Sequence, residues 1–164
     1  MAIPKFSNEP VLDFTTPANK KKQLDALKKI KAGLGQEFPI LIGSEHIRLD
    51  EKFSSFNPSR PTEVIGVFQK GSTALANKAM DVALAAFEQW KTVAPAKRAA
   101  VLFKAAAIMK KKRFELNAIM ILEVGKTWPE ADADTAEAID FLEFYGREML
   151  RYGEEHPVVK NPGE

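Results

Sequence analysis

The stretch PEADADTAEAIDFLEFYGREMLRYG, from Pro129 to Gly153, decides the fold. Proline at its start, acidic residues in its first turns and two arginines near its end are the charge order that a helix dipole favours, so the stretch predicts one long helix. A helix that is apolar around most of its circumference is usually buried on several sides. The apolar side chains are spread in this way over Ile139, Phe141, Leu142, Phe144, Tyr145 and Leu150. We therefore expect this helix to pack against several other elements.

Four further segments predict helices, namely residues 18–35, 71–91, 94–112 and 113–126. Ser72 is expected to cap the second of them, Pro95 to stand in the first turn of the third, and Gly125 to end the fourth. The lysines of residues 18–35 predict a solvated face in preference to a basic partner-binding helix. In residues 71–91, we expect a single buried stripe made of Leu75, Ala79, Ala83, Ala86, Phe87 and Trp90.

The region between the first two helices predicts strands. Residues 38–49 contain two apolar runs around Gly43–His46, a hairpin pattern. Residues 52–61 indicate a short strand that ends in a turn at Asn57–Pro61, and residues 62–71 indicate another strand. Strands so few and short need a partner surface. The fold class is therefore α+β and mainly helical, with a small β-hairpin and sheet beside packed helices.

Composition excludes several classes of protein. Of the 164 residues, 45% are hydrophobic, enough for a globular core, and the net charge is only +2, which argues against a nucleic-acid or membrane-surface partner. There is no cysteine, hence no disulfide and no thiol nucleophile, and only two histidines, which give poor support to a metal cluster. No apolar signal core or membrane span is recognisable, so the expected location is the cytoplasm.

Glu137 is the candidate binding residue. It shares one face of the long helix with Phe141, four residues on, and Phe144, seven residues on. A carboxylate beside two phenyl rings is unfavourable unless a positive or hydrogen-bonding group meets it. The pattern alone favours a structural carboxylate over a ligand contact, because structural ion pairs are common.

Three other charged motifs have a structural explanation. Glu123–Lys126 reads EVGK but lacks the upstream glycine of a phosphate loop, so it predicts a helix end with a glycine cap. The basic cluster Lys110–Arg113 predicts a solvated junction between helices. The acidic series from Glu130 to Glu143 predicts dipole pairing and solvation at a helix start, with Asp132 and Asp134 on different sides.

Several segments in succession resemble the N-terminal third of aldehyde dehydrogenases. They are FNPSRPTEVIG, ALAAFEQWK, RAAVLFKAAAIMKKKRFEL, EVGKTW and EADADTAEAIDFLEFYGREM. NEPVLDF near the start and EADADTAEAIDF resemble the bacterial branch of that family that oxidises L-glutamate γ-semialdehyde, formed from 1-pyrroline-5-carboxylate, to L-glutamate in proline degradation. The resemblance covers residues 8–164 and implies an NAD-dependent oxidoreductase, normally a homo-oligomer.

The resemblance also implies what this chain lacks. In the family a cysteine thiolate attacks the aldehyde, a hydride passes to NAD, and a glutamate activates the water that releases the acid. Those residues and the main NAD-binding motifs are expected beyond residue 164. The chain is thus expected to be an N-terminal fragment without the complete Rossmann-like and catalytic domains, and inactive alone. No catalytic, cofactor-binding or metal-binding residue is expected in it.

One site residue carries over from the family. The glutamate of AEAID lies near the substrate pocket and helps receive the α-amino group, a position that Glu137 matches. With the resemblance included, a substrate contact becomes the favoured role of Glu137, whereas core packing stays favoured for Phe141 and Tyr145. Two alternatives remain open: an aldehyde dehydrogenase of other specificity, and a non-catalytic helical interaction module.

The resemblance also divides the chain. Residues 1–18 are expected to form an extended arm, and residues 19–155 a helical and small-sheet part of the NAD-binding domain. Residues 156–164, which read as a strand at Pro157–Lys160 and a turn, are expected to begin the oligomerisation flap.

Overall fold

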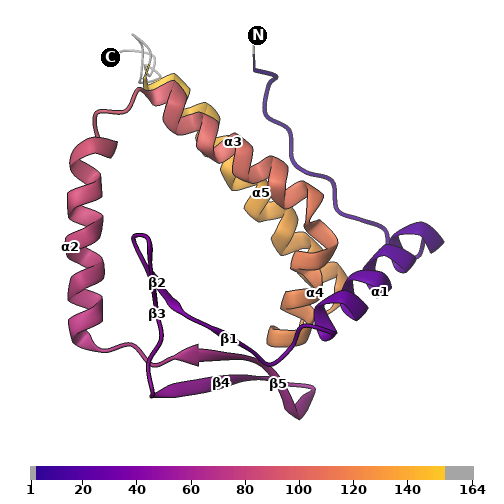
Figure 1. The fold of residues 1–164 in the computed structure, drawn as a ribbon. Helices are drawn as coiled ribbons and strands as arrows, with labels where there is room; N and C mark the ends of the chain where they lie inside the picture. The colour runs from indigo at the N-terminus through magenta and orange to yellow at the C-terminus, as the bar shows by residue number, and fades with distance from the viewer. Residues whose placement is uncertain (1–2, 154–164) are drawn as a thin grey trace, which may run out of the picture.

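The computed structural model describes residues 3–153 of the chain and confirms a mainly helical α+β fold (Figure 1). The elements in order are α1 Pro17–Lys31, β1 Gln36–Phe38, β2 Ile40–Ile42, β3 Glu45–Ile47, β4 Lys52–Asn57, β5 Arg60–Gln69, α2 Thr73–Trp90, α3 Pro95–Lys111, α4 Arg113–Val124 and α5 Trp128–Tyr152. The predicted tail strand and flap, at residues 156–164, lie outside the described residues. Within residues 3–153 no helix has the length and apolarity that crossing a membrane requires.

The long helix α5 is the centre of the helical part. It runs beside α3, and α4 packs against both α5 and α1 (Figure 1). Small side chains allow this close approach, and the buried apolar residues of the four helices are Ala26, Ala99, Ala106, Ala118, Leu122, Ala131, Ala136 and Ile139. The contact is close at Gly146, where an added Cβ would lie 2.6 Å from the Phe103 ring.

The local signals at helix ends are confirmed. Ser72 caps α2 by accepting a hydrogen bond from the Leu75 N–H, and Pro95 opens α3. Gly125 ends α4 with φ of 75°, a backbone conformation that glycine adopts without strain. At the start of α5, Thr127 and Glu130 form a capping box.

The strands form two small sheets. The predicted hairpin is present as antiparallel β2 and β3, with Gly43 in the turn at φ of 59°. In the other sheet β5 pairs with β4 in antiparallel fashion and with β1 in parallel fashion. Strand β1 was not predicted; it consists of three residues, and its partner lies 30 residues away.

The predicted burial of α2 is wrong. None of its residues is buried, and Phe87 and Trp90 are among the exposed large side chains. Figure 1 shows α2 apart from the packed helices for most of its length. Its contacts with the hairpin come from the middle of the helix, where Lys78 pairs with Glu45 at 2.6 Å and Val82 lies against Gly43. The apolar spacing predicted a helix correctly but could not show which surface covers it.

Candidate functional site

Helix α5 has a buried and an exposed face. The buried face holds Ala131, Asp132, Thr135, Ala136, Ile139 and Gly146. The opposite stripe holds Glu130, Ala133, Glu137, Phe141, Phe144, Tyr145 and Tyr152, all exposed, and from Glu130 to Phe144 they are spaced by three or four residues. The candidate site is the middle of this stripe, from Glu137 to Tyr145, because it combines a carboxylate with three aromatic rings.

Glu137 is exposed to solvent. Within residues 3–153 its carboxylate has neither a hydrogen-bond nor an ion-pair partner, although the other acidic residues near it on α5 do. Asp134 pairs with Lys126, Asp140 accepts bonds from the N-terminal arm, and Glu143 pairs with Arg147. Water can therefore hydrate Glu137, which removes the unfavourable burial that its aromatic neighbours suggested. The carboxylate is available to a cationic group.

The aromatic rings form one connected cluster beside Glu137. Phe141 stacks on Tyr145 with centroids 6.0 Å apart, and Phe144 meets Tyr145 edge to face at 5.3 Å. Phe6 of the arm meets Phe144 edge to face at 5.5 Å. Phe141 is 50% exposed and Tyr145 is 56% exposed, so the expectation that both rings are core residues is wrong for this chain. Both rings lie on the exposed surface of α5 instead.

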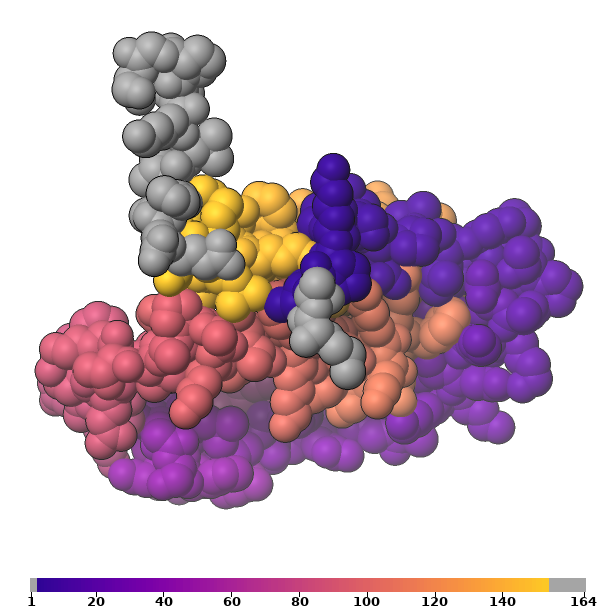
Figure 2. All heavy atoms as spheres, turned by 90° about the horizontal axis from the view of Figure 1, so that it is seen from above, coloured from indigo at the N-terminus to yellow at the C-terminus, as the bar shows by residue number. Residues whose placement is uncertain are grey.

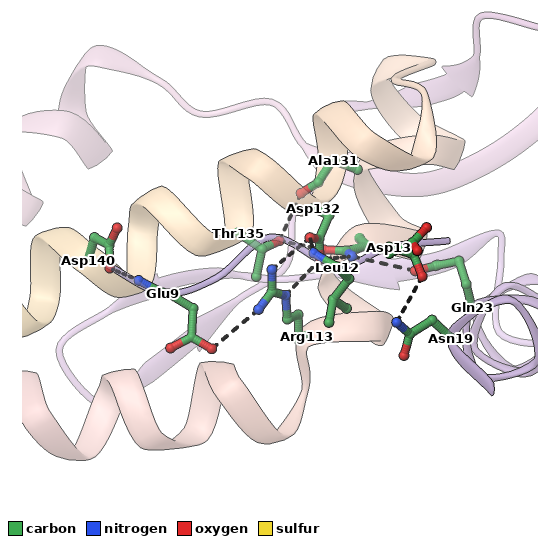
Figure 3. A network of polar contacts seen from close by, with 11 residues as sticks. Glu9, Leu12, Asp13, Asn19, Gln23, Arg113, Ala131, Asp132, Thr135 and Asp140 are labelled. Carbon is green, nitrogen blue, oxygen red and sulfur yellow. Dashed lines mark hydrogen bonds and ion pairs between the residues drawn. The ribbon is translucent and has the colours of Figure 1, made fainter. Parts of the chain in front are cut away.

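A buried ionic network fixes the opposite face of α5 (Figure 3). Arg113, at the start of α4, donates to Asp132 from Nε at 2.7 Å and from Nη2 at 2.6 Å. Asn117 donates to Asp132 at 3.0 Å and accepts from the Thr135 hydroxyl at 2.6 Å. The backbone N–H of Leu12 adds a bond to Asp132 at 2.7 Å. The network joins α4, α5 and the arm.

These bonds determine the protonation state of Asp132. Burial works to raise the pKa of its carboxyl group, but the bonds from Arg113, the Leu12 N–H and Asn117 outweigh burial, and the pKa lies below its ordinary value of 3.8. Asp132 is therefore an ionised, fully paired structural group. A substrate role for it is not supported.

The network corrects two predictions. Lys110, Lys111 and Lys112 are exposed as expected of a solvated junction, but Arg113, the last member of that cluster, is buried. Asp132 is likewise buried, although Asp134 does lie on a different side as predicted. The spacing of Asp132 with Thr135, Ala136 and Ile139 on one helix face was the signal that it lies inside.

The N-terminal arm is bonded on both sides of the turn that carries Glu137. Asn8 Nδ2 and the Glu9 N–H donate to the two oxygens of Asp140, at 2.8 Å and 2.7 Å, three residues after Glu137. The Leu12 bond to Asp132 lies five residues before it. Figure 2 shows the arm seated against α5. The arm therefore holds the candidate site in place.

The end of α4 and the start of α5 do not form a phosphate site. As predicted for EVGK, α4 ends at Gly125, and Lys126 pairs with Asp134. The first turn of α5 is occupied by the Glu130 carboxylate, whose pKa is lowered by hydrogen bonds from Thr127. A negative group at this helix start opposes a second anion. Among residues 3–153 no group of three metal-ligating side chains is present.

Comparison with known proteins places this fold in one enzyme family. The family model of the aldehyde dehydrogenase family matches residues 46–163, and the chain belongs to that family. The predicted resemblance to the N-terminal part of its fold is confirmed.

Within the family, one subgroup is most prominent among the similar proteins. The chain is 49% identical over 162 residues to the 1-pyrroline-5-carboxylate dehydrogenase of Geobacillus sp. (strain WCH70), covering 99% of this chain and 32% of that protein. A crystal structure of 1-pyrroline-5-carboxylate dehydrogenase from Thermus with bound NAD is 41% identical, with a TM-score of 0.90 over 99% of this chain and 32% of that one. Proline utilization A from Bdellovibrio bacteriovorus is 41% identical, with a TM-score of 0.89 over 93% and 16%. The chain thus spans about a third of the length of the curated relatives it matches.

Proposed function

We propose that this chain is the N-terminal segment of an NAD-dependent dehydrogenase that oxidises L-glutamate γ-semialdehyde, formed from 1-pyrroline-5-carboxylate, to L-glutamate in proline degradation. Its part in the reaction is to hold one wall of the substrate pocket, the Glu137–Tyr145 surface of α5. The proposal is supported by the 1-pyrroline-5-carboxylate dehydrogenases that share up to 49% of its residues.

The single observation that carries the substrate assignment is the unpaired Glu137 carboxylate beside the aromatic cluster. Glutamate γ-semialdehyde carries an ammonium group, which a carboxylate binds by a charge-assisted hydrogen bond. Aromatic faces within about 6 Å add attraction for the same cation. An aldehyde without an amino group would gain neither contact, so Glu137 acts as a specificity residue.

We expect no phosphate-binding site for NAD at the junction of α4 and α5. The glycine at residue 125 ends a helix instead of opening one, and Glu130 occupies the nearby start of α5. The chain also contains no cysteine to attack an aldehyde. We therefore expect the purified chain, mixed with NAD and the semialdehyde, to form no NADH.

The decisive test replaces Glu137 with Gln in an enzyme made by joining residues 1–164 to the remaining two thirds of the Geobacillus relative. Loss of a charge-assisted bond should lower kcat/KM for the semialdehyde roughly 10- to 100-fold, mainly through KM. Activity toward a simple aliphatic aldehyde should stay unchanged. Glu130→Gln is the matched control, since it removes a carboxylate from the same stripe and keeps the capping box.

Two results would overturn the assignment. Unchanged semialdehyde kinetics in Glu137→Gln would favour an aldehyde dehydrogenase of other specificity. Equal losses for both aldehydes would make Glu137 a structural residue.

A further inference from the structure

A hollow lies beside Tyr145, and Glu137 is not among its lining residues. It has a volume of about 350 Å³ and is bounded by the end of α2, by α3 and by α5. Its lining residues are Trp90, Arg98, Leu102, Tyr145, Glu148, Met149 and Tyr152. This size is at the lower end of the range of small-molecule sites, and an apolar wall with a few polar groups is typical of them.

Arg98 is the exceptional residue of this hollow. Its Nε is buried, and it is the one buried side-chain nitrogen or oxygen in the described part of the chain that has no hydrogen-bond partner. The other arginines of the helical region are engaged: Arg113 with Asp132, Arg147 with Glu143, and Arg151 with Glu148. A buried donor without a partner on a charged group has a free-energy cost, and an acceptor that reaches the guanidinium removes that cost.

The one acidic residue of the hollow does not neutralise Arg98. Glu148 accepts hydrogen bonds from Arg151, from Nε at 2.9 Å and from Nη2 at 2.5 Å. These bonds lower the pKa of Glu148, so its carboxyl group is ionised and balanced by Arg151. Arg151 also lies over the Tyr152 ring at 4.3 Å. The charge that remains at the hollow is the positive charge of Arg98.

We propose that this hollow binds a small aromatic carboxylate, whose carboxylate meets the Arg98 guanidinium and whose ring lies among Trp90, Leu102 and Tyr145. A guanidinium presents a planar fork that matches a carboxylate, and Nε is one prong of it, so a slight turn of Arg98 toward the ligand satisfies the orphan donor. Aromatic side chains on the wall favour an offset or edge-on ring over an aliphatic chain. The hollow shares Tyr145 with the proposed semialdehyde surface, but it prefers an anion, whereas Glu137 prefers a cation.

The test uses the intact 164-residue chain and three probes of nearly equal shape. Phenylacetate, phenylacetamide and phenethylamine differ in their charge. Trp90 reports on binding through its fluorescence, and Trp128→Phe makes it the only tryptophan of the chain. We expect phenylacetate to bind at least 10-fold more tightly than the amide, and the amine to bind no more tightly than the amide. If the chain with an intact Arg98 bound phenylacetate and phenylacetamide with equal affinity, the proposal would be overturned.

The matched variants are Arg98→Met and Arg48→Met. Methionine keeps much of the apolar stem and removes the orphan donor, so Arg98→Met should keep its melting temperature and lose at least 10-fold in affinity for phenylacetate. Arg48, which pairs with Glu37 beside the hairpin, should be dispensable for binding. Binding that survives Arg98→Met, or that leaves Trp90 fluorescence unchanged, would contradict the assignment.

Discussion

Arg113 and Asp132 form a bidentate ion pair in which the arginine is 6% and the aspartate 1% exposed at the side chain. Such a pair contributes little more than apolar packing would, but it makes the structure depend on both partners. Asp132 also receives Asn117 and the arm, so its carboxylate is the point where α4, α5 and residue 12 meet. The bonds to Asp132 therefore hold in place the helix α5, whose exposed face carries Glu137.

Asp132→Ala should therefore destabilise the chain strongly. It leaves the Arg113 charge buried without its main partner, a change that typically costs about 3–5 kcal/mol in the free energy of unfolding. Denaturant unfolding followed by circular dichroism measures it. Asp25→Ala is the control, because Asp25 pairs with Lys21 on the exposed side of α1, and its removal should change the unfolding free energy by less than about 1 kcal/mol. Similar losses in both variants would contradict the role given to the buried pair.

A second prediction concerns stability in acid. Hydrogen bonds from Lys52, then from Arg48 and Gln69, lower the pKa of Glu37 from 4.5 to about 2. Because the folded pKa is the lower one, the stabilisation from Glu37 is complete above about pH 4.5 and is lost as pH falls toward 2. Glu37→Gln should thus be less stable than the parent at pH 6 and lose less of its stability between pH 5 and pH 2.5.

The control for the Glu37→Gln variant is Glu51→Gln. Glu51 lies 3.4 Å from Lys70 on an exposed surface, so its variant should follow the pH profile of the parent chain. Denaturant midpoints measured from pH 2.5 to pH 6 separate the three proteins. A Glu37→Gln profile parallel to that of the parent would show that the three donors do not hold the carboxylate in solution.

Local chemistry made most of the fold predictable from sequence. Ser72 and Pro95 place helix starts because the first satisfies a backbone N–H and the second has none to satisfy, and Gly125 places a helix end because glycine adopts the left-handed conformation without strain. The two-residue turn at Gly43 similarly fixed the hairpin. Charge order predicted α5 almost to its last residue. These features depend on neighbours within four residues, which a sequence displays directly.

Long-range pairing explains what the sequence did not reveal. The burial of Arg113 follows from Asp132, 19 residues later, and from a backbone N–H more than 100 residues earlier. Strand β1 forms because its three residues pair in parallel with β5. For the candidate site, the spacing predicted Glu137 beside aromatic rings. Only the structure revealed that Glu137 has no partner among residues 3–153 and that Phe141 and Tyr145 are exposed.

Gly146 provides a third prediction, about the contact of α3 with α5. A Cβ at this position would lie 2.6 Å from Phe103 Cε1 and 2.8 Å from Cζ, well inside van der Waals contact. Alanine favours a helix by about 1 kcal/mol over glycine, so Gly146→Ala would be stabilising if space existed. We expect it instead to destabilise the chain by about 1–3 kcal/mol through overpacking.

A double-mutant cycle with Phe103→Leu isolates that clash. With the smaller side chain at residue 103, adding Gly146→Ala should be neutral or stabilising, so the two changes should couple by at least about 1 kcal/mol. Thermal and denaturant unfolding of the four proteins give the coupling. Additive effects would show that the ring moves aside freely and that the two helices are less closely packed than described.

The exposed face of α2 gives the last prediction. Met80, Leu84, Phe87 and Trp90 recur along one side of this helix, and all are exposed. An apolar stripe of this kind on the chain should bind an environment-sensitive dye such as anilinonaphthalene sulfonate. Leu84→Gln with Phe87→Gln should lower the dye fluorescence at least twofold and change the unfolding free energy by less than about 1 kcal/mol, because neither side chain is buried. Leu24→Gln, on the distant helix α1, removes one exposed leucine from outside the stripe and should leave most of the dye signal. A marked loss of stability in the α2 variant would mean that this face is covered in solution.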